Sequence, residues 1–150
     1  VPLGVMLPRN VKNLLLPVPV SGSHIGFSTL RMEPCWMALG QAAGIAASLA
    51  IDSQVPVQDV DLYRLQDLLI GQKATLVYYR DVRPDDTHFR LVQYMGLRGY
   101  LPEWNADLQG TVDEETLHCW SALCGFSLKA IPGKTSRLEV LSMIYERLCK

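Results

Sequence analysis

The residues best suited to chemistry in this sequence lie in one short stretch, residues 21–33. A small-residue loop, Ser21-Gly22-Ser23-His24-Ile25-Gly26, contains His24, whose imidazole can donate a hydrogen bond or a proton to a ligand. Arg31 stands directly before an uncharged run, where its guanidinium can either hold an anion or clamp loop carbonyls. For the histidine, the alternative is a locally bonded surface imidazole. We take His24 and Arg31 as the candidate catalytic residues.

Other chemical motifs are missing from the sequence. None of the eleven glycines forms a G-x-G pair, so the glycine-rich turn that holds a dinucleotide pyrophosphate is not here. The run Gly22-Ser23-His24-Ile25-Gly26 lacks the G-x-S-x-G spacing of a nucleophile elbow. The four cysteines form no C-x-x-C pair, which supports neither a zinc site nor a disulfide framework and leaves the compartment open. We expect no metal site.

The elements that must position the candidate residues are a strand and a helix. Residues 14–20 form a short apolar run typical of a strand buried on both faces, although Pro17 and Pro19 would make it irregular or place it at an edge. Residues 34–51 carry no charge and predict a helix with Pro34 in its first turn. Its small residues favour a helix packed closely on a sheet over a membrane span. We expect the free amides near Glu33 to face a polar cofactor group.

Charge divides the chain into two parts. Residues 1–75 carry five basic and five acidic side chains, and residues 76–150 carry nine and ten. The chain is therefore predicted to consist of residues 1–73, the C-terminal part of a larger domain, and residues 74–150, a small mainly helical module. In the second part a strand is expected at 76–79, and helix caps are expected at Asp86 or Thr87, at Thr111 and at Ser136. The predicted fold class is α+β and mostly α.

Composition narrows the functional classes. The formal net charge of −1 argues against a nucleic-acid binder, and 49% hydrophobic residues argue against a disordered chain. The sequence opens with Val1-Pro2-Leu3-Gly4 and no methionine, from which we expect a fragment of a longer protein.

The stretch 12–44 strongly resembles one family, the C-terminal end of bacterial FAD-dependent oxidoreductases of the glutathione-reductase structural type, many of them labelled xanthan-lyase-like. The resemblance rests on three runs: Ser21-Gly22-Ser23-His24, Arg31-Met32-Glu33-Pro34 and Met37-Ala38-Leu39-Gly40-Gln41-Ala42-Ala43. It extends from Leu3–Pro8 to about Leu69, which is the first half of the chain.

In that family the last strand of the FAD domain leads into a loop and a final helix that close over the flavin. The resemblance implies that Ser21, Gly22 and Ser23 lie near the cofactor, together with His24. It also implies that Met32 and Glu33, beside Arg31, flank the helix end that faces the isoalloxazine or the substrate. The strand, loop and helix would then be a remnant of an FAD-binding α/β domain.

Residues 81–122 are more loosely similar to S-layer-homology-like modules, which bind cell-wall polysaccharide. The matching runs are Asp81-Val82-x-Pro84, Thr87-His88-Phe89 and Arg98-Gly99-Tyr100. A helical appendage that packs on the flavin domain is the alternative interpretation.

Together these observations predict a C-terminal fragment of a FAD-dependent oxidoreductase that closes the flavin site in its parent protein and is inactive alone. Its expected partners are the rest of the FAD-binding domain and an unknown small-molecule or carbohydrate substrate, with FAD held by the parent rather than by the fragment. An exposed apolar patch would also allow self-association. The alternative is a non-catalytic interaction module in residues 76–150, which would bind carbohydrate, cell wall or a partner protein.

Overall fold

The computed structural model describes residues 1–149, which are almost entirely helical. They form six α-helices and two short 3-10 helices, and no sheet occurs among them. A single isolated β-bridge in the described part of the chain joins Thr111 to Ser136. The chain folds as two compact units, one of residues Val1–Ala74 and one that begins at Thr75. The expected α+β class is therefore wrong in its β component and correct in being mostly α.

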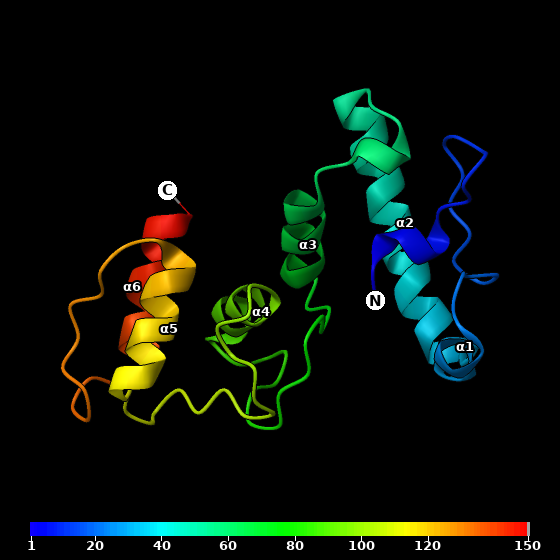
Figure 1. Cartoon of the computed structure of the whole chain (residues 1–150). Coiled ribbons are helices and arrows are strands. Elements are labelled where there is room, and N and C mark those ends of the chain that lie inside the picture. Colours follow the sequence, from blue (N-terminus) through cyan, green and yellow to red (C-terminus); the bar gives the residue numbers. More distant parts are fainter. Residues whose placement is uncertain (150) are drawn as a thin grey trace. The chain divides into compact units, whose positions relative to one another are not determined.

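The first unit is built around one long helix. Its elements in chain order are η1 (Leu3–Met6), α1 (His24–Leu30), α2 (Glu33–Ser53), η2 (Val57–Asp59) and α3 (Leu62–Gly71). Helices α1, η2 and α3 all contact α2, and Figure 1 shows α1 close to the N-terminal end of α2. The unit is therefore an α2 core helix with shorter helices against it.

Helix α2 begins with Pro34 in its first turn and ends at Gln54, whose left-handed backbone (φ 54°) stops the helix. One face is buried, by Leu39, Ala43, Ala46, Leu49 and Ala50. The opposite face leaves Met37 and Ile51 exposed by 75% and 76%. By length and composition α2 is the one described helix able to cross a membrane, a test that core helices of soluble proteins also pass.

The strand expected at residues 14–20 does not form. The segment is irregular, and its backbone donors reach the carbonyls of η1 instead: Leu16 donates to Met6 (2.9 Å) and Ser21 donates to Val5 (2.8 Å). A strand needs a neighbouring strand to pair with, and Pro17 and Pro19 have no N–H to offer. No described segment of this chain supplies that neighbour, so the apolar run stays unpaired.

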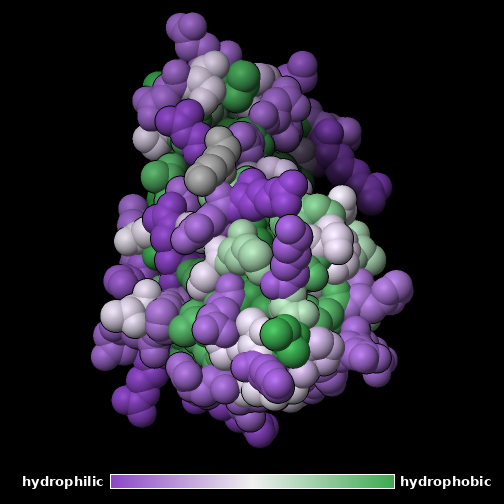
Figure 2. All heavy atoms as spheres, turned by 90° about the vertical axis from the view of Figure 1, so that its left-hand side faces the viewer, coloured by the Kyte–Doolittle hydropathy of each residue, from purple (hydrophilic) through white to green (hydrophobic). Residues whose placement is uncertain are grey.

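The second unit has three helices around one core. They are α4 (Phe89–Leu97), α5 (Glu114–Cys124) and α6 (Arg137–Leu148) (Figure 1). The core combines aliphatic side chains with aromatic ones whose polar atoms are hydrogen-bonded: Tyr79 Oη donates to Leu101 O (2.8 Å), and Trp120 Nε1 donates to Tyr100 O (2.8 Å). The face of the molecule in Figure 2 mixes hydrophilic side chains with smaller apolar patches.

The helix caps of the second unit match the predicted ones in part. Ser136 and Glu139 form the predicted capping box at α6. At α5 the prediction of Thr111 is wrong by two residues, because the Asp113 carboxylate takes the Thr116 amide (2.7 Å), a bond that also lowers the pKa of Asp113. At α4 the cap is His88, whose amide donates to Asp86 Oδ1 (2.7 Å).

The strand expected at residues 76–79 also does not form. The side-chain amide of Gln93, 1% exposed, takes the place of a strand partner. Its Oε1 accepts from the amides of Leu76 (2.8 Å) and Val77 (2.9 Å), and its Nε2 donates to Val77 O (2.7 Å). The segment is thus extended and hydrogen-bonded without a sheet.

Candidate functional site

The candidate residues cluster around α1, at the N-terminal end of α2. Ser21 and Gly22 lead into α1, Ser23 caps it, and His24 is its first residue. Arg31 follows α1 as its C-cap, Met32 is the N-cap of α2, and Glu33 opens α2. The structure therefore brings the residues of the two predicted groups to the two ends of one short helix, and all of them are exposed.

Ser23 has a structural role at this site. Its Oγ accepts the Gly26 amide at 3.1 Å, which caps α1. An added Cβ at Gly26 would lie 3.2 Å from that oxygen, so a side chain there would press on the cap. Contact between the Ser23 hydroxyl and a ligand would compete with the cap.

His24 and Arg31 are separated by the length of α1. Seven residues make about two helical turns, so the two backbones lie on one face of α1 and about 10 Å apart. Side chains of this length can reach one extended ligand from both ends of α1. An imidazole and a guanidinium thus lie at opposite ends of one face of α1, and both are exposed to solvent in this chain.

The N-terminal end of α2 offers little to an anion. Pro34 has no N–H, and the amides of Cys35 (2.9 Å) and Trp36 (3.2 Å) both donate to Met32 O. The first turn therefore leaves at most the Glu33 amide for a ligand, beside the negative Glu33 carboxylate. The expectation that several free amides face a cofactor group here is wrong, because the turn closes on its own cap carbonyl.

Large apolar side chains surround the candidate residues and face outward. Ile25 is 82% exposed and Met32 is 52% exposed, and Phe27 and Met37 belong to the same set. Of this set, sequence reasoning assigned Met32 to the site and did not assign Ile25, Phe27 or Met37. The local sequence does not show whether an apolar residue beside a polar loop is exposed, because its exposure depends on which other parts of the unit pack against it.

Trp36 adds one unsatisfied polar atom near this end of α2. Its Nε1 is buried and has no hydrogen-bond partner within the described chain. A buried donor without a partner is unfavourable and is rare in complete domains.

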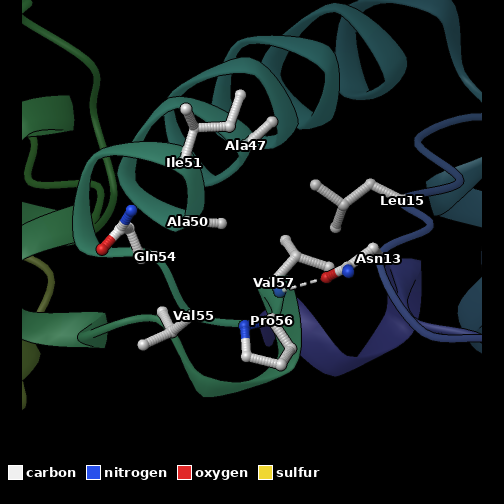
Figure 3. A pocket seen from close by; sticks show the side chains of 9 residues that line it. All are labelled: Asn13, Leu15, Ala47, Ala50, Ile51, Gln54, Val55, Pro56 and Val57. Carbon is white, nitrogen blue, oxygen red and sulfur yellow. Dashed lines mark hydrogen bonds between the residues drawn. The ribbon is translucent and has the colours of Figure 1, made fainter.

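A hollow of about 610 Å³ lies at the other end of α2 (Figure 3). It is lined mainly by apolar side chains, with Ala47, Ala50 and Ile51 from α2 facing Leu15 and Val57. The amide oxygen of Asn13, a residue with φ 57°, accepts the Val57 amide at 3.0 Å and fixes the rim. Seventeen residues separate Glu33 from Ala50, about 25 Å along the helix, so the hollow is distinct from the candidate residues.

Residues 1–69 match the family model of the FAD dependent oxidoreductases. No curated protein and no solved structure matches the chain. The matched range ends within α3, before the second unit begins at Thr75. It contains every candidate residue around α1.

The candidate residues fit only a part of a flavin site. An FAD pyrophosphate needs a glycine-rich turn and free helix amides, and this chain has neither a G-x-G pair nor an open first turn at α2. What the chain does offer is an imidazole, a guanidinium and an apolar surface at one helix end. No group of three metal-ligating side chains occurs within the described residues.

Proposed function

We propose that residues 1–69 are the C-terminal part of the FAD-binding domain of an oxidoreductase, and that loop 21–23, α1 and the first turn of α2 close one side of its flavin site. The observation that carries the proposal is the match of residues 1–69 to the FAD dependent oxidoreductase family. The exposed Ile25 and Met37 support it, because a neighbouring body would cover such apolar side chains.

The chemistry of this role is limited to a few groups of the chain. FAD, when bound, accepts the hydride that the substrate loses. The His24 imidazole takes or returns the proton of the reacting group, since an imidazole ring has one nitrogen that can accept a proton and one that can donate it. The Arg31 guanidinium holds an anionic substrate group at the other end of α1. Met32 and Ile25 exclude water from the space between the His24 imidazole and the Arg31 guanidinium.

The first test is an absorbance scan with an intact-mass measurement. We expect the purified 150-residue chain to bind less than one equivalent of FAD, because the pyrophosphate site lies elsewhere. Protein captured from its source with antibodies to this chain should have a mass well above 16.7 kDa and show flavin bands. Stoichiometric FAD on the 150-residue chain, or a source protein of 16.7 kDa without flavin, would contradict the proposal.

The second test asks whether the residues around α1 affect the reaction more than exposed residues of the same types elsewhere in the chain. In the flavin-containing protein, His24→Ala and Arg31→Ala should slow flavin reduction by at least tenfold while FAD content stays constant. The matched controls are His118→Ala on α5 and Arg64→Ala on α3, which replace exposed residues of the same types. Equal effects of the site variants and their controls would show that the residues around α1 do not serve the reaction.

A further inference from the structure

The hollow at the C-terminal end of α2 is separate from the residues proposed for flavin chemistry. Its volume of about 610 Å³ falls within the range of small-molecule sites, which is about 300–1,000 Å³. The small side chains of Ala47 and Ala50 leave space on the α2 side, and Leu15 and Val57 face them (Figure 3). The hollow is therefore concave, with walls from three segments of the first unit.

Hydrogen bonds hold these walls together. The Val55 amide donates to Ala50 O at 3.0 Å and ties the segment after α2 to the last turn of the helix. Between the other two walls, Asn13 Oδ1 accepts the Val57 amide (3.0 Å), and the Asn13 amide donates to Gln58 Oε1 (3.3 Å). The hollow is thus preorganised, which lowers the entropy cost of binding a ligand.

Water is a poor occupant of this hollow. A water molecule in a cavity needs about two to four polar partners. Among the described residues that line the hollow, only Asn13 and Gln54 have polar side chains, and the Asn13 oxygen is already bonded to the Val57 amide. An apolar ligand would replace this water and cover apolar surface such as Ile51, which is 76% exposed.

The charge and the size of the lining decide between ligand classes. None of the nine described residues that line the hollow is charged, so a carboxylate or an ammonium group would lose its hydration without gaining an opposite charge. Nine residues are also too few for a protein partner, because specific protein interfaces use about 20–30 residues on each side. The two side-chain amides lie at opposite sides of the view in Figure 3, with the apolar side chains between them. This lining matches a small neutral molecule with an apolar chain and one polar end.

We propose that the hollow binds a neutral amphiphile, a molecule with an alkyl chain and one uncharged polar head group. The chain lies over Ala47 and Ala50, between Ile51 and Leu15, along the last two turns of α2, a length of about 10 Å. The head group, a hydroxyl or a carbonyl, bonds to the side-chain amide of Gln54. The site lies wholly in the first unit and does not depend on the proposed flavin role.

Titration of the whole 150-residue chain with 1-octanol, followed by amide NMR, tests this site. The Val55 and Val57 amides are the reporters, because both belong to the walls of the hollow. We expect saturable shifts with a dissociation constant below about 1 mM. Binding of 1-hexanol should be about tenfold weaker, because each CH₂ group that leaves water raises the affinity about fourfold. Octanoate has an alkyl chain of similar length with a charged head group, and it should bind at least about tenfold more weakly than 1-octanol.

Two pairs of variants locate the binding. Ala47→Phe fills the hollow and should weaken 1-octanol binding at least about tenfold, with the exposed Ala38→Phe elsewhere on α2 as its control. Ile51→Glu places a charge beside the alkyl chain and should weaken binding at least about fivefold. Its control is Met37→Glu at the other end of α2, where the native side chain is equally exposed, at 75%. Both glutamate variants replace exposed side chains, so neither should prevent folding.

Three results would overturn the proposal: no saturable shift with 1-octanol, octanoate that binds as tightly as 1-octanol, or equal losses in the site variants and their controls. Sedimentation velocity without 1-octanol examines one other occupant. Self-association that Ile51→Glu abolishes and Met37→Glu does not would assign the hollow to a second copy of the chain, and it would also overturn the proposal.

Discussion

The two units bury equally many hydrophobic side chains but differ in what those side chains are. Twelve buried hydrophobic residues lie in Val1–Ala74 and twelve in the described part of the second unit. The first set includes three alanines of α2 and no aromatic residue, whereas the second includes Tyr79, Phe89, Tyr100 and Trp120. Among the described residues, twelve exposed large hydrophobics belong to the first unit and six to the second. The second unit therefore encloses its own core, and the first leaves more large apolar side chains exposed.

The largest expected effect tests the closed core. Trp120→Ala removes a buried indole, its hydrogen bond to Tyr100 O and the ring beneath Arg137. We expect the free energy of unfolding of the second unit to fall by about 3–5 kcal/mol. Urea unfolding followed by circular dichroism measures it, with the exposed Trp104→Ala as the control, for which we expect less than about 1 kcal/mol. Similar losses in both variants would remove the distinction between core and surface.

A smaller effect tests how tightly that core is packed. An added Cβ at Gly96 would overlap the hydroxyl of the buried Tyr79, which donates to Leu101 O. We expect Gly96→Ala to destabilise the second unit by about 1–3 kcal/mol through this overlap. The urea concentration at the midpoint of unfolding should fall accordingly. A variant as stable as the original chain would show that the core can rearrange to accommodate the added methyl group.

A glycine-to-alanine substitution in the first unit should have the opposite effect on stability. A Cβ at Gly44 of α2 meets nothing within 4 Å. Gly44→Ala should therefore stabilise the isolated chain by about 0.5–1 kcal/mol, because alanine favours the helix. In the proposed longer flavoprotein, where a neighbour covers α2, it should be neutral or destabilising. Thermal unfolding of both proteins with and without the substitution measures this difference, and equal stabilisation in both would argue that the face is open there too.

The smallest effect concerns pH and belongs to the second unit. Burial and a hydrogen bond to the Cys149 thiol raise the pKa of Tyr94 to about 12. Above pH 10 the unfolded tyrosine loses its proton before the folded one, so stability falls as pH rises from 10 to 12. Tyr94→Phe should reduce this fall. It should not abolish it, because burial also raises the pKa of Tyr79 and Tyr100. Unfolding free energies at pH 9, 10 and 11 test the slope, and an unchanged slope would contradict the role of Tyr94.

Local sequence signals predicted several helix starts, but they missed α1, which begins within the expected loop 21–26, and both expected strands were wrong. Pro34 and the Ser136–Glu139 box mark helix starts that the structure confirms. Such signals act within a few residues, so they need no distant partner. The apolar run 14–20 and the segment 76–79 have strand-like composition, but a strand also needs a paired neighbour. Sequence composition cannot show that Gln93 or η1 takes the place of that neighbour.

The candidate site could likewise be predicted from the sequence only in part. The family-like runs placed Ser21–Glu33 in one region, and the structure arranges them around α1. Their roles in catalysis and in cofactor binding stay predictions. The closed first turn of α2 depends on Pro34 and on the direction of Met32 O, which spacing alone does not reveal. The edge-to-face contact between the exposed rings of Tyr78 and Trp104 could likewise not be predicted from spacing, because it depends on the Arg80–Trp104 backbone bond that joins the two segments.

The three hydrogen bonds of Gln93 also determine where the chain can be cut. They fix Leu76 and Val77 from the inside of the second unit, so a protease needs local unfolding to reach that backbone. Lys73, exposed and with φ 64°, lies just outside this anchored stretch. Cleavage after Lys73 would release the second unit with its anchor intact, whereas cleavage after Arg80 would cut the anchored segment from the unit. Gln93 thus makes the junction between the units a defined boundary for limited trypsin digestion.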